Sequence, residues 1–174
     1  MDTKYWHIAG MLFTLLFGVL LHFTYGWSDG NPLVGIFSAV NESTWEHLKL
    51  LFTPIFLFAV LEYFAYGYQL PNFIPVKLLS ILLGMFTIVS AFYTYTGIIG
   101  RNYFWMDITI FILGVIVAYL FSFIILQTNY FSSSISVLLG LVGICLLLIC
   151  FIIFTFNPPT LPLFLDPIFL SYGV

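Results

Sequence analysis

The chain has 174 residues, of which 62% are hydrophobic and only 6% are charged. A soluble domain carries about a quarter charged residues, so this chain cannot cover itself with a water-facing surface, and lipid must be the solvent for most of it. The net charge of −3 argues against a nucleic-acid partner, which needs a basic surface. The hydrophobic composition predicts membrane lipids as partners.

Five segments approach the roughly 20 apolar residues that a membrane-spanning helix needs. The last two are the clearest, because no charged residue occurs between Asp107 and Asp166. We therefore predict an all-α membrane protein of about five transmembrane helices that form a single domain over residues 1–174. In chain order the predicted spans are about Tyr5–Gly26, Ser43–Tyr66, Pro75–Ile98, Phe104–Leu126 and Ser134–Phe156.

The second segment is the least regular of the five. Its charge-free part, Leu50–Leu61, is too short to span a bilayer alone, so charged residues must enter the membrane at both of its ends. Pro54 lies near its middle and predicts a kink. A re-entrant hairpin is the alternative for this segment.

Two stretches are not predicted to span the membrane. Residues 28–41 begin as a turn, and Leu33–Val40 could continue as a short helix along the interface. The tail, residues 157–174, contains prolines 158, 159, 162 and 167, which exclude a continuous helix. Because the tail is also rich in leucine, isoleucine and phenylalanine, we predict that it is irregular and packs against one membrane surface.

Alternating spans distribute the polar residues unequally between the two ends of the bundle. We define side A as the side of residue 1 and side B as the opposite side. Five of the seven acidic residues and two of the three histidines are expected near side B, together with Lys49, Tyr93, Tyr95 and Arg101. Side A receives Asp2, Lys4, His7, Glu62 and Lys77, and we expect Glu62 to pair with Lys77. A polar pocket is therefore predicted near side B.

The basic residues give little information about orientation. Lys4 and Lys77 lie on side A, and Lys49 and Arg101 lie on side B, whereas cytoplasmic loops usually carry an excess of such residues. Because the longer and more acidic loop is on side B, we expect the N-terminal side to be cytoplasmic.

Residues 40–49, VNESTWEHLK, contain the residues best suited to chemistry. On a helix, residues four apart share a face, so Glu42 aligns with Glu46 and Ser43 aligns with His47. Ionisable groups within a membrane usually face a protein interior or a water-filled cavity. Carboxylates and imidazoles together bind a divalent metal such as zinc, or relay a proton. The candidate metal ligands are His22, Glu42, Glu46, His47 and Asp107.

A structural interpretation of these residues stays open. Ser43 and Glu46 fit a capping box, in which each satisfies an amide group at the start of a helix. Glu46 and Lys49 also fit an ion pair three residues apart. Asp107 begins a predicted helix, where a carboxylate favours the helix dipole. Further candidates for the side-B pocket are Ser43, Lys49, Tyr93, Tyr95, Arg101 and Asp166.

Several stretches of the sequence are distinctive over nearly its whole length. They are VNESTWEHLKLLF, EYFAYG, FYTYTGIIG, the Asp107-Ile108 pair and the tail NPPTLPLFLDP…YG. Together they resemble a family of small bacterial membrane proteins that is catalogued only as a domain of unknown function. The resemblance implies a multi-pass protein of the bacterial cytoplasmic (inner) membrane and supplies no activity.

The spacing of Ser43 and His47 is similar to a pattern in a superfamily of seven-helix, metal-dependent membrane hydrolases, which includes alkaline ceramidases and adiponectin-receptor-like proteins. This chain departs from that pattern, because it has too few helices and lacks the late pair of histidines. The likeness therefore serves only as an analogy.

Three functions remain open from the sequence, and whether the protein is an enzyme is undecided. A side-B pocket could bind a cation or a small polar solute, as in a transporter or channel. Alternatively, a metal-dependent hydrolase of lipid-like substrates would use His22, His47 and one or two of Glu42, Glu46 and Asp107 as ligands. The third possibility is a structural or partner membrane subunit, and a homo-oligomer is compatible with each.

Overall fold

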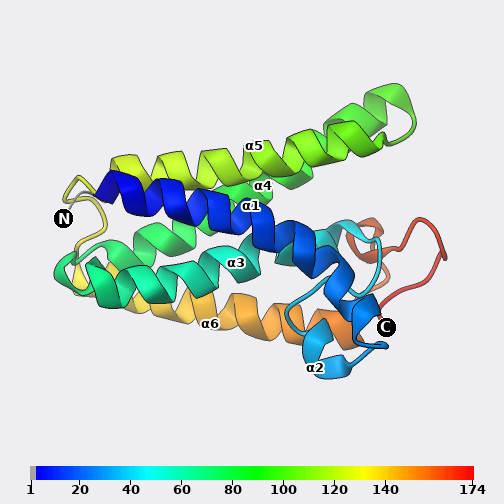
Figure 1. Cartoon of the computed structure of the whole chain (residues 1–174), viewed down its shortest axis with the longest axis horizontal. Coiled ribbons are helices and arrows are strands. Elements are labelled where there is room, and N and C mark those ends of the chain that lie inside the picture. The colour runs from blue at the N-terminus through cyan, green and yellow to red at the C-terminus, as the bar shows by residue number, and fades with distance from the viewer. Residues whose placement is uncertain (1–2) are drawn as a thin grey trace.

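The computed structural model describes residues 3–174, and within them the chain is all-α (Figure 1). Five helices are long and apolar enough to cross a membrane, which makes this a multi-pass membrane protein and confirms the predicted fold. Asp2, expected on side A, lies outside the described residues. The spans are α1 (Thr3–Trp27), α3 (Thr44–Ala65), α4 (Phe73–Ile99), α5 (Phe104–Ile125) and α6 (Ser134–Phe156).

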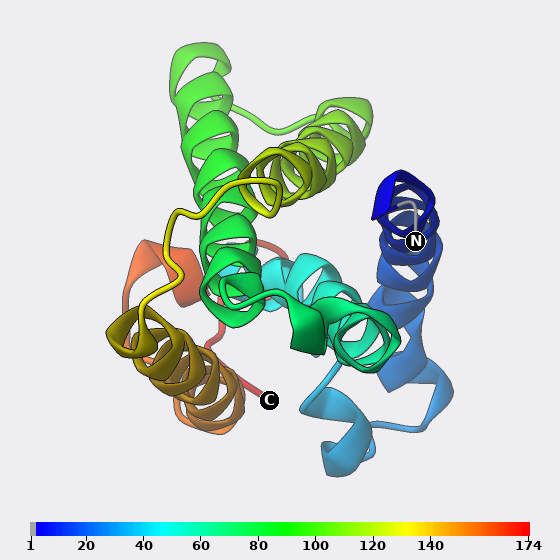
Figure 2. The same ribbon diagram turned by 90° about the vertical axis from the view of Figure 1, so that its left-hand side faces the viewer.

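The five spans run alternately in opposite directions, so the connections gather at two ends of the bundle (Figure 1). Residues 66–72 and 126–133 lie with the N-terminus at side A. Residues 28–43 and 100–103 lie with the tail at side B. Figure 2, which looks along the bundle, shows α3 and α4 between the other three helices. These two are also the most buried of the spans, whereas α6 is the least buried.

The second span is one continuous helix, α3, and not a re-entrant hairpin. Pro54 lies inside it and has no N–H, which leaves the carbonyl of Leu50 without its usual helical donor. Gly18 of α1 lies against this carbonyl, because a Cβ added at Gly18 would be only 2.7 Å from Leu50 O. Glycine therefore lets α1 approach α3 closely at the interrupted turn.

The crossing of α4 and α5 also depends on glycine. A Cβ at Gly84 would lie 2.9 Å from the carbonyl oxygen of Gly114. The sequence pair Ser80 and Gly84 is typical of such close helix contacts in membranes. Apolar side chains fill the interior between α3, α4 and α5, and Leu51, Ile81 and Val115 are at most 1% exposed.

The two stretches that do not span the membrane each contain little regular secondary structure. The helix α2 covers only Pro32–Gly35, shorter than the expected Leu33–Val40, and Asn31 caps it by accepting a hydrogen bond from Leu33 N. The tail contains the 3-10 turn η2 (Pro162–Phe164) and an isolated bridge between Leu165 and Tyr172. Phe164 is buried against Trp45 of α3, so the tail packs on the bundle. Its position at a membrane surface stays a prediction.

Candidate metal centre and adjoining cavity

Glu46 and Lys49 form a buried ion pair at the side-B end of α3. Their charged atoms are 2.5 Å apart, and the side chains are 2% and 0% exposed. Lys49 Nζ also donates to Gly35 O and to Thr155 Oγ1, at 2.7 and 2.8 Å. Glu46 Oε2 accepts from Val40 N at 3.0 Å. This network joins the 28–43 loop, α3 and α6. Both carboxylate oxygens of Glu46 have partners within it, and Glu46 is not grouped with the other candidate metal ligands.

Ser43 begins α3, but the predicted capping box forms only in part. Its hydroxyl oxygen accepts from Glu46 N at 3.3 Å, as the box requires. The second bond of the box, from Ser43 N to the Glu46 carboxylate, does not form. Ser43 N donates instead to Asn41 Oδ1, and the Glu46 carboxylate pairs with Lys49. The carbonyl of Ser43 accepts from His47 Nδ1 at 2.9 Å. That bond fixes the tautomer of His47 and leaves its Nε2 free of a proton when the ring is neutral.

His22, Glu42 and His47 meet at side B, with one possible ligand atom of each within 4.8 Å of the others. His22 comes from the penultimate turn of α1, Glu42 from the loop, and His47 from the first turn of α3. His22 Nε2 lies 3.8 Å from Glu42 Oε1, and His47 Nε2 lies 3.5 Å from Glu42 Oε2. The side chains are 29 to 39% exposed. We call these three residues the His-Glu-His cluster.

The His-Glu-His cluster has an unused polar atom. His22 Nδ1 is buried and has no hydrogen-bond partner among the described residues. A buried polar atom without a partner costs free energy, and such atoms in native proteins usually indicate a bound water, an ion or a functional role. The two imidazole rings lie 5.2 Å apart between centroids, and the other ring nitrogen of His22, Nε2, is the one that lies near the Glu42 carboxylate.

The tail holds the backbone at Glu42. Asp166 is 1% exposed, and its Oδ2 accepts from Glu42 N at 3.2 Å. Its Oδ1 accepts from Ile168 N and Phe169 N, at 2.7 and 3.1 Å, and so shapes the tail. Asp166, a predicted pocket residue, therefore connects the tail to one member of the cluster through the main chain.

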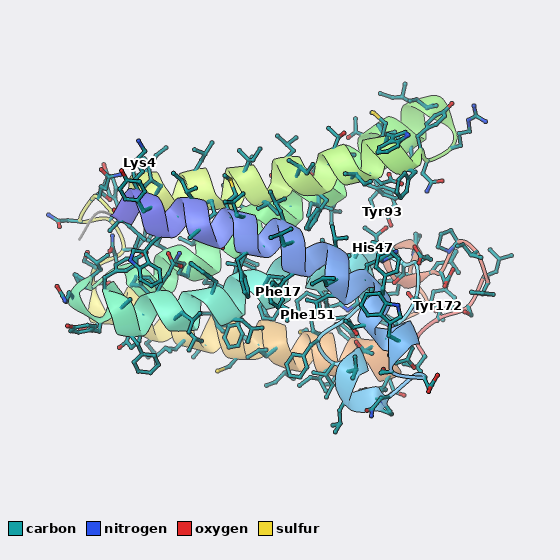
Figure 3. All side chains as sticks on the ribbon, viewed as in Figure 1. Lys4, Phe17, His47, Tyr93, Phe151 and Tyr172 are labelled. Atoms are coloured by element: carbon teal, nitrogen blue, oxygen red, sulfur yellow. The ribbon has the colours of Figure 1, made fainter. Side chains whose placement is uncertain are left out.

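A cavity of about 570 Å³ adjoins the cluster between α3, α4, α5 and the tail. Figure 3 shows His47 and Tyr93 near one another at the side-B end of the bundle. The polar part of the cavity lining consists of Glu42, Thr44, His47, Tyr93, Asn102 and Asp107. The apolar part consists of Leu50, Ile88, Phe92, Ile110 and Phe111, with Pro162, Leu165, Pro167 and Ile168 from the tail.

Asp107 lines this cavity but is not a member of the His-Glu-His cluster. Its carboxylate accepts hydrogen bonds from Tyr95 Oη and from Asn102 Nδ2, the second at 3.3 Å. Tyr95 in turn accepts from Tyr103 N at 3.1 Å. Asp107 and Tyr95 therefore fix the connection between α4 and α5.

The remaining candidates from α4 and its following loop divide between the cavity and the surface. Tyr93 Oη accepts a hydrogen bond from the Thr44 hydroxyl at 3.5 Å across the cavity. Arg101 is exposed, lies 4.7 Å from the centroid of the Tyr103 ring and donates to its hydroxyl at 2.8 Å. The guanidinium therefore does not line the cavity.

Side A has a separate polar cluster, and the expected pairing of Glu62 with Lys77 is confirmed. Lys77 Nζ lies 2.5 Å from Glu62 Oε2, and both side chains are at most 2% exposed. Tyr66 donates to Glu62 Oε1 at 2.6 Å. Burial and the neighbouring Glu62 charge raise the pKa of Tyr66, so its hydroxyl keeps the proton that it donates. The group is internally satisfied.

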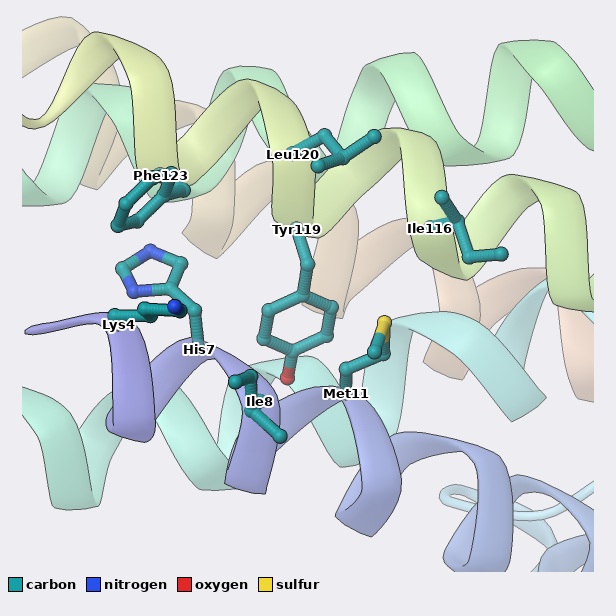
Figure 4. A pocket seen from close by; sticks show the side chains of 8 residues that line it. All are labelled: Lys4, His7, Ile8, Met11, Ile116, Tyr119, Leu120 and Phe123. Atoms are coloured by element: carbon teal, nitrogen blue, oxygen red, sulfur yellow. The ribbon is translucent and has the colours of Figure 1, made fainter.

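A second cavity, of about 350 Å³, lies between α1 and α5 near side A (Figure 4). Its lining is almost entirely apolar apart from Lys4 and His7 at one end and the Tyr119 hydroxyl. His7 donates from Nδ1 to Thr3 O, and its Nε2 contacts Ser122 Oγ at 3.2 Å. The third histidine of the chain therefore joins two helices and has both ring nitrogens in use.

Sequence reasoning did not single out three polar residues that the structure places at side B. Thr155 bridges Glu46 and Lys49 from α6, where its only signal was a polar residue inside an apolar run. Thr44 and Asn102 line the cavity, and both stand next to residues that had been selected. Their positions depend on how separate helices meet, which no local pattern specifies.

Comparison with known proteins adds a family but no activity. A family model matches residues 1–174, and the family is described as one of unknown function. No curated protein matches the chain, and no solved structure matches it.

Proposed function

The chain belongs to DUF6512, a family of unknown function, and on that premise we propose from its geometry that it is a metal-dependent membrane hydrolase. The metal would be held by the His-Glu-His cluster. The observation that carries the proposal is the approach of His22, Glu42 and His47, from three separate segments, to within 4.8 Å of one another.

The type and number of ligands favour a catalytic metal. Structural zinc normally has four protein ligands, whereas hydrolytic zinc has three, such as two histidines and a glutamate, and keeps a position for water. Ligands bonded at about 2.0–2.1 Å around a tetrahedral ion are about 3.4 Å apart. His22 and His47 approach different oxygens of Glu42, at 3.8 and 3.5 Å, and one ligand atom of each residue lies within 4.8 Å of the others, so the three side chains would have to move closer together to bind an ion.

The surroundings of His47 agree with a metal ligand. A ligating imidazole usually donates its second N–H to a carbonyl or carboxylate, which fixes the ring and its tautomer. His47 Nδ1 makes such a bond with Ser43 O. A zinc ion at the cluster would lower the pKa of bound water to about 7. Held by His22, Glu42 and His47, such an ion would supply a water nucleophile for the hydrolysis of an acyl ester or amide.

Transport and a purely structural role have less support. Transport needs a polar route to side A, and its expected continuation, Glu62 and Lys77, is a closed and buried pair. A structural cluster would have its polar atoms satisfied internally, as the Glu46–Lys49 network does. The unpartnered Nδ1 of His22 and the cavity beside Glu42 and His47 differ from that arrangement.

The metal content of the protein tests the proposal. Protein purified in detergent without chelators is expected to contain one zinc or similar divalent ion per chain by mass spectrometry. His22→Ala, Glu42→Gln and His47→Ala should each lose the ion. His7→Ala is the matched control, because this histidine bonds α1 to α5 near side A, and it should retain the ion. Wild-type protein without metal would contradict the proposal.

A hydrolytic assay separates an enzyme from a metal-binding scaffold. Wild-type protein should hydrolyse a fluorogenic acyl ester, lose that activity when a chelator removes the metal, and recover it when zinc is added. Stoichiometric metal without hydrolysis of any acyl ester or amide would leave only cation binding or a structural role.

We further propose that residues 1–174 form one transmembrane domain of the bacterial cytoplasmic membrane, with side A in the cytoplasm. The cluster would then face the extracytoplasmic side. Cysteines introduced at Tyr130 on side A and Phe169 on side B, after replacement of Cys145 and Cys150, test this orientation. An impermeant thiol reagent should label intact cells only at position 169, and the reverse pattern would overturn the assignment.

A further inference from the structure

The cavity beside the His-Glu-His cluster changes character with depth. On α4, Tyr93 contributes a hydroxyl to the lining, whereas Ile88 contributes an apolar side chain five residues earlier. At about 1.5 Å per residue the two are separated by about 7–8 Å along the helix. On α5, the lining changes in the same way from Asp107 to Ile110 and Phe111 within about one turn. Along α4 and α5 the lining therefore changes from a polar end, at Tyr93 and Asp107, to an apolar end toward the middle of the bundle, while the tail adds apolar side chains at side B.

The level of this polar end in a bilayer can be inferred from α5. Phe104 and Trp105, in its first turn, are 69% and 76% exposed. Exposed aromatic residues at helix ends are typical of the membrane–water interface. Asp107 lies within the same turn, so the polar end is at headgroup depth. Ile110 lies deeper along the helix, at the level of lipid chains.

The charges at the polar end select among headgroups. Within the part of the chain that the structure describes, the charged residues lining the cavity are Glu42 and Asp107, with His47 beside them, and neither lysine nor arginine contributes. A negative headgroup charge would lie close to Glu42 and Asp107 without a basic side chain to offset it, so an uncharged headgroup is favoured over an anionic one.

The size of the cavity limits the number of chains. A volume of about 570 Å³ is within the usual range for one small ligand, about 300–1,000 Å³. Leu165 and Ile168 of the tail contribute to its apolar lining. A single hydrocarbon chain with a small headgroup fits this space, whereas a two-chain phospholipid is much larger.

We propose that the cavity binds one uncharged single-chain amphiphile of the monoacylglycerol type. Its headgroup would lie beside Glu42 and His47, and its chain would pass Ile88 and Ile110 between α4 and α5. This inference rests on the proposed function only in making an acyl ester the substrate class. Binding of the chain itself requires the cavity and not the metal.

A photoreactive monoacylglycerol, with a diazirine near the end of its chain, tests the binding site. The probe is added to wild-type protein in detergent, and the crosslinked residues are mapped by mass spectrometry. Crosslinks should concentrate at Ile88, Ile110 and Phe111. Crosslinks spread over lipid-facing residues such as Leu113 and Leu139, with no excess at the cavity, would overturn the proposal without any variant.

Variants and competitors then sharpen the result. Ile110→Trp fills the apolar end and should abolish the cavity crosslinks, while the matched control Ile112→Trp, two residues away and 38% exposed, should leave them unchanged. Unlabelled monoacylglycerol should compete about five- to tenfold better than the fatty-acid anion of the same chain length. Equal competition by the two would overturn the assignment of an uncharged headgroup.

The proposed function can fail independently of this site. His22→Ala should lose the metal and keep the cavity crosslinks, because His22 does not line the cavity. If wild-type protein contains no metal but is crosslinked at Ile110, the amphiphile site stands and the hydrolase does not. If metal is present and the crosslinks are not at the cavity, the opposite conclusion holds.

Discussion

Two clusters of ionisable side chains each take two members from residues 40–49 and differ in how many of their polar atoms have hydrogen-bond partners. Glu46 and Lys49 are buried, and partners from the loop and from α6 complete their hydrogen bonds. Glu42 and His47 are more than a third exposed and, with His22, leave a buried ring nitrogen without a partner. The first cluster holds segments together, and the second has binding capacity left. In a membrane protein, ionisable residues with unpartnered polar atoms therefore indicate a binding site better than ionisable residues alone do.

The largest effect is expected from breaking the buried pair. Lys49→Met leaves the Glu46 carboxylate buried without its cation, which in buried pairs costs about 3–5 kcal/mol of the free energy of unfolding. Denaturation of the purified protein in mixed micelles, followed by circular dichroism, measures this change. His47→Ala should lower the free energy of unfolding much less, because its side chain is about one third exposed.

A double variant checks that the loss comes from an uncompensated charge. In Glu46→Gln with Lys49→Met, the amide oxygen can still accept from Val40 N, and no charge remains buried. Most of the lost stability should return, since neutral replacement of a buried pair is often well tolerated. If Lys49→Met alone is as stable as the wild type, the contrast between the two clusters does not hold.

Most of the fold follows from the sequence, because the bilayer imposes a length and a composition on each span. All five predicted helices are present with ends that differ by no more than one turn. The sequence did not decide between a continuous helix through Pro54 and a re-entrant hairpin, and the structure has the continuous helix α3. In the structure Gly18 of another helix lies against the freed Leu50 carbonyl, a tertiary contact that no pattern within the second segment contains.

The candidate site was predictable only in outline. Counting the spans was enough to place His22, Glu42 and His47 at one side, because alternating helices fix which ends share a face. Helical spacing, however, grouped Glu42 with Glu46, and in the structure Glu42 precedes the helix that contains Glu46. The separation between a closed pair and an open cluster depends on Thr155, Gly35 and the tail, which approach from distant parts of the chain.

A smaller effect is expected from Asp166, which connects the tail to the open cluster. Asp166→Ala removes the acceptor for Glu42 N, and partners that orient a ligand typically contribute about 10–100-fold to metal affinity. Zinc affinity, measured by competition with a chromogenic chelator, should fall by that factor, and the absorption spectrum of the cobalt-substituted protein should change. Phe164→Ala is the control, because it removes a different tail contact, the packing of Phe164 against Trp45 with ring centroids 5.0 Å apart. If both variants weaken zinc equally, the tail acts by packing alone, whereas an effect confined to Asp166→Ala assigns this carboxylate the positioning of Glu42.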